Sequence, residues 1–337
     1  MTVASPAPGR VVEADRPPAV SRREARAMGS PLRLQVAGRA PATILDEAWA
    51  AVVEEFEATE QALSRFRPTS EIHRLRLADG LATEPSRRLV AALTAAERAR
   101  RLTGGRFDPR VLHDLERLGS KPIEVPELPG SATPGRPDPA TPLFRRAGRQ
   151  GAVEVPVPVD FGGIGKGLAL RWAADRAAAS LADWPFLLEA GGDIVGRGAP
   201  AAAGWRVGLE DPRPASDTAA GPVLVLELPA PGGAIATSSV RRARWLAPDG
   251  RPVHHLIDPR SGEPGGDGLL AVTVAGSDPA WAEVWSKALF LEGRHGIAAL
   301  ARSCGLAAWW VTVDGEVEMT PAARLRTVWV AAEARRR

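Results

Sequence analysis

Tyrosine is absent from this sequence of 337 residues, and cysteine and lysine are scarce. The single cysteine, Cys304, excludes an intramolecular disulfide framework, and its position beside an apolar run predicts a thiol packed in the core. No run approaches the roughly 18 apolar residues of a membrane helix, and no apolar segment follows the N-terminal arginines as in a signal peptide. We therefore expect a cytoplasmic protein with no membrane span.

Positive and negative side chains nearly balance, so the excess of either sign is small. The net charge of +3, without a long basic run, argues against nucleic acid as a partner. Arginine has replaced lysine almost everywhere, and the only lysines are Lys121, Lys166 and Lys287. A lysine retained under such a bias indicates a position that favours a compact ammonium over a guanidinium group.

Periodicity along the chain predicts an α+β fold. Residues 1–27 are rich in proline, alanine and arginine without periodicity and predict a disordered N-terminal segment. Residues 28–331 then form a single domain, in which the proline- and glycine-rich stretch 121–150 is a loop insertion. Runs of consecutive strands between grouped helices indicate α+β rather than a doubly wound sheet. The main helices are predicted over 42–63, 86–102, 165–182, 279–292 and 295–303, and the main strands over 32–36, 153–159, 186–198, 205–209, 223–228, 234–239, 254–259, 269–276, 307–313 and 326–331.

The stretch DFGGIGKG at 160–167 predicts a loop that binds an anion. It is no Walker A loop, because Asp160 stands where the first glycine is needed and Gly167 follows the lysine. It is no dinucleotide fingerprint either, because Leu168 stands at the last glycine. The glycines still allow close backbone approach, the loop opens a helix, and Lys166 adds a charge. The alternative is a tight turn between strand and helix with no ligand.

Two further segments are candidates for the same cleft. The turn GGD at 191–193 follows FLLEA and brings a second pair of glycines; it too has a purely structural alternative. His254 and His255 precede a turn, and on a strand they point to opposite faces, so at most one faces a site. A neutral imidazole beside a hydroxyl is a general base at pH 7, whereas the alternative is a pair of surface histidines.

In their order along the chain, nine segments resemble the ApbE family, the FAD:protein FMN transferases. Each is weak alone, but their shared order and spacing over residues 27–315 are specific. The segments are AMGSPLRLQV (27–36), LSRFRPTSEIHRL (63–75), TGGRFDPRV (103–111), VDFGGIGKGLAL (159–170), FLLEAGGDIVGRG (186–198), WRVGLEDP (205–212), AIATSS (234–239), HHLIDPRSGEP (254–264) and AEVWSKALFLEG (282–293).

The resemblance implies a fold and a reaction. The fold is ApbE-like, with mixed, mainly antiparallel sheets and packed helices around an FAD cleft. Members of the family bind FAD and carry its FMN half to a Thr or Ser of an acceptor flavoprotein, with release of AMP. Some members instead hydrolyse FAD to FMN and AMP, and an FAD-binding protein without turnover is a third alternative.

The resemblance also implies roles for particular residues. Lys166 and the backbone of 162–167 lie along the FAD phosphates, and His255 is the base on the acceptor hydroxyl, with Asp258 nearby as a further catalytic residue. Glu189 stands where relatives usually have Asn. The implied FAD-binding residues are Met28, Phe66, Asp108, Gly162, Gly163, Lys166, Glu189, Gly191, Gly192, Asp193, Thr237, Ser238 and His255.

One departure concerns the metal. Relatives hold Mg²⁺ with a carbonyl of the glycine loop, here Phe161, Gly162 or Gly163, and with an Asp and a Thr one helical turn apart. This chain has Glu283 and Lys287 at the last two positions. A protonated ammonium has no lone pair for a metal. Four outcomes stay open: an ion pair with Glu283 along the helix, a weakened metal site through Glu283 with or without Ser286 once Lys287 swings aside, an ammonium in place of the metal, and an inactive site.

Overall fold

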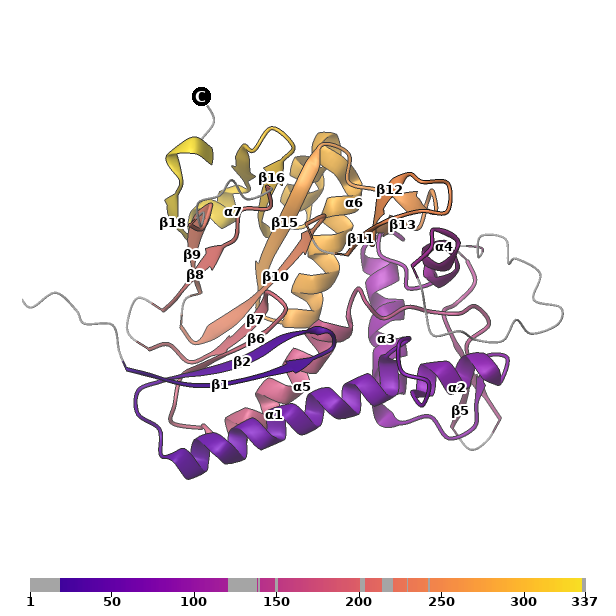
Figure 1. Cartoon of the computed structure of the whole chain (residues 1–337), viewed down its shortest axis with the longest axis horizontal. Helices are drawn as coiled ribbons and strands as arrows, with labels where there is room; N and C mark the ends of the chain where they lie inside the picture. The colour runs from indigo at the N-terminus through magenta and orange to yellow at the C-terminus, as the bar shows by residue number, and fades with distance from the viewer. Residues whose placement is uncertain are drawn as a thin grey trace, which may run out of the picture.

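A computed structural model describes residues 19–120, 138, 140–148, 151–200, 204–213, 221–228, 230–241 and 243–334. The fold is α+β with mainly antiparallel sheets, as the sequence predicts (Figure 1). The central sheet has eight strands, and every neighbouring pair in it is antiparallel. In spatial order these are β1 (Val20–Ala27), β2 (Ser30–Ala37), β6 (Phe186–Ala190), β7 (Asp193–Arg197), β10 (Gly232–Ser239), β15 (Leu269–Gly276), β16 (Ala307–Thr312) and β17 (Val317–Met319).

Three long helices cover one face of this sheet: α1 (Ala42–Leu63), α5 (Gly165–Ser180) and α6 (Pro279–Ser303). α1 and α5 pack on β2 and β6 through alternating apolar residues such as Leu34 and Leu188, which are fully buried. The opposite face is covered by a small sheet of β8 (Trp205–Leu209), β9 (Leu224–Leu228) and β18 (Thr327–Val330), which pack against residues such as Trp309. The middle of the central sheet is therefore buried on both faces, whereas the edge strand β1 alternates between exposed and half-buried residues.

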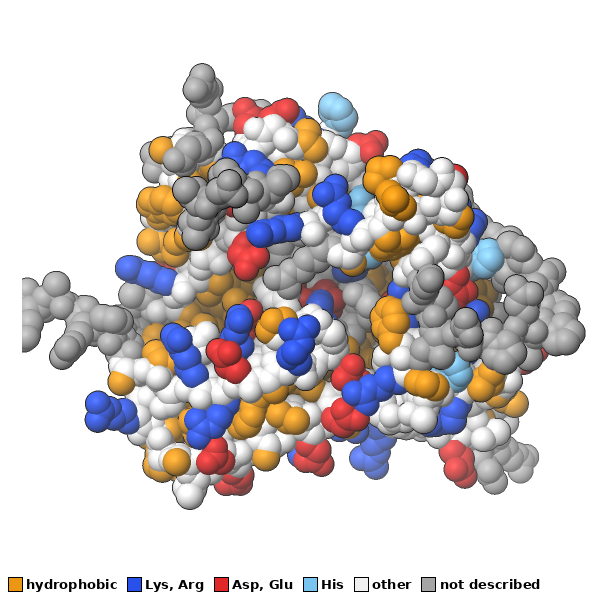
Figure 2. Space-filling model, in the orientation of Figure 1, with side chains coloured by type: hydrophobic (Ala, Val, Ile, Leu, Met, Phe, Trp, Pro, Cys, Tyr) orange, Lys and Arg blue, Asp and Glu red, His pale blue; other side chains and the backbone are white. Residues whose placement is uncertain are grey.

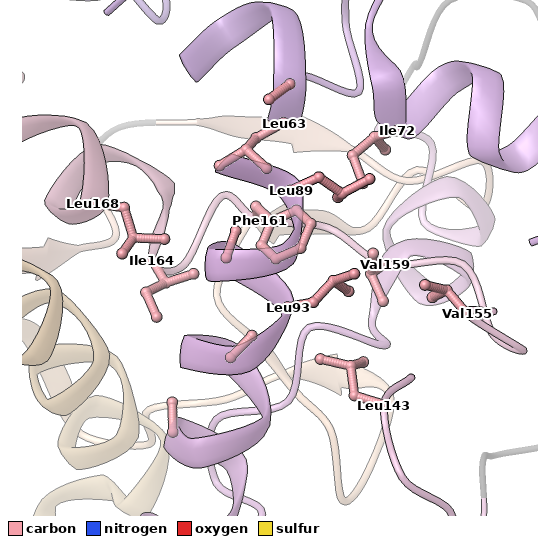
Figure 3. Packing of buried hydrophobic residues seen from close by; sticks show 14 of the residues in the cluster. Leu63, Ile72, Leu89, Leu93, Leu143, Val155, Val159, Phe161, Ile164 and Leu168 are labelled. Carbon is pink, nitrogen blue, oxygen red and sulfur yellow. The ribbon is translucent and has the colours of Figure 1, made fainter. Parts of the chain in front are cut away.

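A second core lies beside the helices and holds the glycine loop (Figure 3). α3 (Arg87–Leu102) contributes Leu89 and Leu93, and the loop contributes Phe161 and Ile164; all four side chains are buried. Because two loop side chains are anchored here, the backbone between them has a fixed place. Around this core lie α2 (Glu71–Leu77), α4 (Leu112–Arg117), β3 (Leu81–Ala82), β4 (Arg145–Ala147) and β5 (Ala152–Glu154).

The remaining elements are short. Two small hairpins lie between β10 and β15 along the chain, and a short helix and a helical turn lie near the C-terminal end of the described residues. They are β11 (Arg244–Leu246) with β12 (Pro252–His254), β13 (Ile257–Asp258) with β14 (Glu263–Pro264), α7 (Pro321–Arg324) and the 3₁₀ turn Ala332–Ala334. Within the described residues, none of the helices combines the length and apolar character that crossing a bilayer requires.

Most predicted elements are confirmed, including helices α1, α3 and α5. The two helices predicted over 279–292 and 295–303 are joined as α6, with Gly293 non-helical at φ 73° and ψ 170° between them. Asp278 begins α6 by accepting a hydrogen bond from the Trp281 amide at 3.0 Å.

Four expectations need correction. The predicted disorder of residues 1–27 is wrong for β1, which pairs in register with β2; residues 1–18 lie outside the described residues. The strand predicted over 153–159 ends at Glu154, because prolines follow at 156 and 158 and cannot donate to a ladder. Cys304 is exposed at the end of α6 rather than packed in the core. The predicted insertion 121–150 contains β4, although residues 121–137, 139, 149 and 150 lie outside the described residues.

Candidate active site

A cavity of about 590 Å³ lies where the glycine loop meets the β1–β2 turn, the end of α1, the segment before β13 and α6. Figure 2 shows the hollow near the centre of this face of the molecule. Its volume is in the range of small-molecule sites. Eight of the residues singled out from the sequence line it: Met28, Phe66, Asp108, Gly162, Gly163, Lys166, His255 and Lys287.

Apolar and aromatic side chains form one part of the wall. Met28 lies in the tight β1–β2 turn with φ 49°, and its methyl carbon is 3.6 Å from the position of an added Cβ on Gly165. Phe66 is 59% exposed at the mouth, with the Arg65 guanidinium 4.2 Å above its ring. A planar apolar ligand therefore has an exposed aromatic edge to contact at the entrance.

Lys166 occupies the first turn of α5, and two buried carboxylates hold its ammonium. Its Nζ donates to Asp193, at the start of β7, and to Glu283 of α6 at 2.8 Å. Burial alone lowers the pKa of Lys166, but the charges of these two carboxylates raise it well above its ordinary value. The ammonium is therefore a permanent point charge at a fixed place in the wall.

The same carboxylates also accept backbone hydrogen bonds. Glu283 Oε2 accepts from the Gly167 amide at 2.8 Å, and Asp193 Oδ1 accepts from the Thr237 amide at 3.0 Å. These bonds tie α5, α6, β7 and β10 together around Lys166. Because both oxygens of Glu283 already accept hydrogen bonds within the protein, few of its lone pairs are free to bind a ligand.

Several amides of the glycine loop are already bonded within the protein. The Gly162 amide donates to Asp160, and the Gly165 amide donates to the Phe161 carbonyl at 2.7 Å. Gly167 has another purpose, since an added Cβ there lies 2.5 Å from the Ala280 Cα. That glycine allows α5 and α6 to approach closely, a packing role that the sequence did not predict.

Lys287 extends from α6 toward the glycine loop. An added Cβ on Gly163 meets the Lys287 Cε at 2.9 Å, so the glycine leaves room for the lysine stem. The ion pair with Glu283 along the helix is wrong, because Glu283 pairs with Lys166 instead, and Lys287 Nζ has no ion pair or hydrogen bond within the described ranges. Burial lowers the pKa of Lys287; the Glu283 carboxylate opposes this shift and the Lys166 charge adds to it.

The two adjacent histidines face different surroundings, but the continuous strand predicted over 254–259 is wrong, because β12 ends at His254 and His255 lies in the bend that follows. His255 lines the cavity, whereas His254 packs edge-on against Phe290 at a centroid distance of 6.0 Å. Burial and the nearby Lys287 charge lower the pKa of His255 to about 3, so its imidazole is neutral at pH 7. Its Nδ1 is buried and has no hydrogen-bond partner in the part of the chain that the structure describes. The hydrogen-bonding capacity of this nitrogen is therefore unsatisfied by the described residues.

Several predicted residues either lie away from the cavity wall or have side chains that are bonded within the protein. Asp258 accepts hydrogen bonds from Arg260, at 2.8 Å from Nη2, and does not orient His255. The Asp108 carboxylate, although at the wall, is engaged by the buried Arg110 at 2.6 Å. Three other predicted residues form side-chain hydrogen bonds within the protein: Glu189 accepts from Arg33 at 3.3 Å, the Thr237 hydroxyl bonds the Thr273 hydroxyl at 2.9 Å, and the Ser238 hydroxyl bonds the Ser286 hydroxyl at 2.9 Å.

The second glycine turn, at 191–193, contacts Lys166. Gly191 and Gly192 have φ of 62° and 97°, which explains the glycines without a ligand. An added Cβ on Gly191 lies 3.8 Å from the Lys166 Cδ, so this turn borders the stem of the site lysine. Only Asp193 of this turn reaches the ammonium itself.

Comparison with known proteins gives the family. A family model described as the ApbE family matches residues 28–310. The chain belongs to the ApbE family. It is 31% identical to an FAD:protein FMN transferase of Klebsiella pneumoniae (strain 342) over 172 residues, half of each chain. It is 27% identical to the Salmonella typhimurium protein of the same name, over 89% of this chain and 86% of that one.

A solved ApbE protein of Thermotoga maritima has the same fold, with a TM-score of 0.75. The two are 23% identical, and the match covers 91% of this chain and 99% of the other. At this identity the likeness concerns the fold. It supports the α+β assignment for this ApbE chain, including the arrangement of helices on an antiparallel sheet.

Sequence reasoning missed two charged residues at the cavity of this ApbE chain. Arg65 Nε donates to Asp160 at 2.6 Å, while its Nη1 is buried and, among the described residues, unpartnered. Both side chains line the cavity. Each lies inside a segment that resembles the family, LSRFR and DFGGIGKG, so position within the segments was the available signal. Nothing local in the sequence indicates that the two pair across the cavity wall.

The residues present do not fit the Mg²⁺ that the family resemblance implies. Magnesium prefers oxygen ligands in near-octahedral geometry. Both oxygens of Glu283 already bond Lys166 and the Gly167 amide, and Lys287 brings a cation where an oxygen is needed. Nowhere in the described ranges do three or more His, Cys, Asp or Glu side chains come together in a way that could hold a metal. At about 4 Å, each unit of metal charge is repelled by an ammonium by on the order of 1–4 kcal/mol.

Proposed function

We propose that this chain is an FAD:protein FMN transferase. Family membership supports the reaction class, and its relatives from Klebsiella and Salmonella carry that name. The observation that carries the proposal is a single cavity that holds an aromatic edge, two ammonium groups and a neutral imidazole. A dinucleotide with a flavin ring and a diphosphate is matched by that combination.

The flavin ring and the diphosphate of FAD suit different parts of the wall. The isoalloxazine ring suits Met28, Phe66 and Phe107, which offer a thioether and two aromatic rings. The diphosphate suits the part lined by Lys166 and Lys287, because each phosphate group carries a negative charge. In this arrangement the ring enters near the mouth and the reacting phosphorus lies deep, close to His255.

The reaction is attack by an acceptor hydroxyl on the phosphorus of the FMN half. A new bond forms between the Thr or Ser oxygen and that phosphorus, and the bond to the AMP oxygen breaks. The hydroxyl proton passes to a ring nitrogen of His255, and AMP departs with its phosphate charge. Positive groups fixed before the reaction stabilise the charge that develops on the phosphoryl oxygens. Lys166 is such a group, since Asp193 and Glu283 hold it in place.

The low pKa of His255 requires an explanation if it is the base. Efficient proton transfer favours a base whose pKa lies near the working pH. Lys287 is one cause of the depression to about 3, after burial. A bound diphosphate neutralises that charge, so the pKa of His255 rises when substrate binds. Bound FAD therefore relieves the part of the depression that Lys287 causes, while the part caused by burial remains.

The experiment follows AMP and FMN by chromatography after the purified chain is mixed with FAD and an acceptor flavoprotein, which is sought first among the products of neighbouring genes. We expect AMP to form in step with covalently bound flavin on the acceptor, and an acceptor with its target Thr replaced by Ala to stop both. Free FMN without an acceptor would instead support a pyrophosphatase. Retained FAD with no product would indicate a binding protein.

The role of His255 has its own measurement. His255→Gln is expected to lower kcat by about 10²- to 10⁴-fold while FAD binding is retained. The kcat/KM of the unaltered chain should stay flat from pH 8 to about 5, because the free imidazole is neutral throughout this range. Unchanged turnover in His255→Gln would remove this residue from the mechanism.

A further inference from the structure

Lys287 is placed where a ligand with negative charge would meet it. It lines the cavity beside the glycine loop, and its stem is close enough to Gly163 that any side chain there would collide with it. The contact with an added Cβ is 2.9 Å at Cε and 3.1 Å at Cδ. The lysine therefore extends from α6 toward the loop and the cavity rather than along its own helix.

This ammonium has no direct carboxylate contact of the kind that Lys166 has, and the charges of Glu283, Asp193 and Asp160 act on it only from beyond ion-pair distance. Lys166 has two carboxylate partners, whereas Lys287 Nζ forms no ion pair or hydrogen bond with any residue the structure describes. A partly buried charge without a partner is costly to the folded state, and an anionic ligand removes that cost. The site therefore contains one lysine, Lys166, that is paired with two carboxylates, and one lysine, Lys287, that has no direct counter-ion among the described residues.

Both carboxylate oxygens of Glu283, one helical turn before Lys287, already accept hydrogen bonds within the protein. Glu283 accepts from Lys166 and from the Gly167 amide, and the neighbouring Ser286 hydroxyl bonds Ser238 and the Glu283 carbonyl, each at 2.9 Å. A divalent cation would have to break these bonds and would also meet the positive Lys287. The ligand set disfavours a metal and favours the ammonium as the counter-charge.

We propose that Lys287 takes the place of a divalent metal, so that this chain binds the diphosphate of its substrate through protein ammonium groups and needs no metal ion. The inference rests on the proposed function for the identity of the substrate. It makes a statement about binding, which is measured separately from transfer. The Lys287 ammonium contacts the phosphate oxygens, and Lys166 adds a second fixed charge behind them.

Binding of FAD, ADP and riboflavin is measured by calorimetry, once in EDTA and once in Mg²⁺, for the unaltered chain and for Lys287→Gln. We expect FAD and ADP to bind the unaltered chain equally well in both buffers. In EDTA, Lys287→Gln should bind both nucleotides about 10- to 100-fold more weakly, the usual effect of losing a charge-assisted hydrogen bond. Riboflavin has no phosphate, so its affinity should stay unchanged and report an intact site.

Arg302→Gln is the matched control, because it removes an exposed cation from the same helix far along from the loop. It should leave all three affinities unchanged. A direct test for a metal uses Mn²⁺ and electron paramagnetic resonance with the unaltered chain, where we expect no stoichiometric binding, with or without ADP. In Lys287→Thr, a dependence of FAD binding on Mg²⁺ should appear.

The inference is overturned if the unaltered chain binds FAD only with Mg²⁺, if it binds Mn²⁺ stoichiometrically, or if Lys287→Gln keeps full affinity for FAD in EDTA. Failure of the proposed function looks different. FAD that binds without metal but is never transferred contradicts the transferase and leaves the inference standing. FAD that binds in neither buffer contradicts both.

Discussion

Replacing Gly167 by Ala tests why the glycine beside Lys166 is there. The added Cβ lies 2.5 Å from the Ala280 Cα, 2.6 Å from the Pro279 carbonyl oxygen and 2.7 Å from the Ala280 nitrogen. All three are backbone atoms, so α5 and α6 must move apart, and the Gly167 hydrogen bond to Glu283 must lengthen. Overpacking of this kind costs about 1–3 kcal/mol. For a chain of this size, Tm should fall by about 2–6 °C.

Gly165→Ala is the matched control on the same helix. Its added Cβ meets only the Met28 and Phe161 side chains, at ordinary distances of 3.6 and 3.7 Å, and its backbone does not require a glycine. Because Ala favours helix over Gly by up to about 1 kcal/mol, Tm should stay the same or rise slightly. Both variants are compared by scanning calorimetry without ligand. Equal losses of Tm, or no loss in Gly167→Ala, would refute the idea that this glycine exists for helix contact.

Three further perturbations test other parts of the site by chemical and thermal unfolding. Asp193→Asn leaves the Lys166 ammonium less balanced and should cost on the order of 3 kcal/mol in the free energy of unfolding; a loss below 0.5 kcal/mol would contradict the buried pair. His254 and His255 have pKa values lowered to about 4 and about 3, so the unfolded chain binds more protons below pH 6.5, and each should remove up to about 2 kcal/mol between pH 7 and 5. Replacing both by Gln should flatten that part of the profile, and an unchanged slope would exclude them. Arg110→Lys loses a buried bidentate contact to its carboxylate partner and should cost about 1–3 kcal/mol, whereas an unchanged midpoint would make that pair dispensable.

Local pattern in the sequence was enough for most of the helices and strands. The four-residue spacing of apolar side chains predicts α1, and the GG pair at 104–105 marks the end of α3. β1 was missed because it is an edge strand of mostly charged and small residues, with no buried apolar face, whose partner β2 supplies the pairing. Composition alone describes such a segment as disordered.

Contacts between distant parts of the chain were beyond local pattern. The glycine loop, Lys166 and His255 were singled out from the sequence, and the structure brings them to one cavity. Nothing in the sequence indicates that Lys166 pairs with Glu283, 117 residues away. The packing of α5 against α6 determines that Glu283 pairs with Lys166 rather than with Lys287. A helical spacing of four favoured the wrong lysine.

Family resemblance gave the site its chemistry, while the geometry changed the assignment of individual groups. The Gly162 and Gly167 amides were expected along the phosphates, yet carboxylates of the protein accept from both. Asp258 was expected beside His255 and is engaged by Arg260. The expected charge on the wall is nevertheless present, supplied by two ammonium groups rather than by backbone amides.

The most direct test of the account is turnover of FAD in ¹⁸O-labelled water with an acceptor flavoprotein, followed by intact-mass analysis. The account predicts that the acceptor gains one FMN that contains no ¹⁸O, and that AMP is released in equal amount. An unmodified acceptor, with ¹⁸O-labelled FMN accumulating in solution or with FAD left intact, would contradict transfer to a protein hydroxyl.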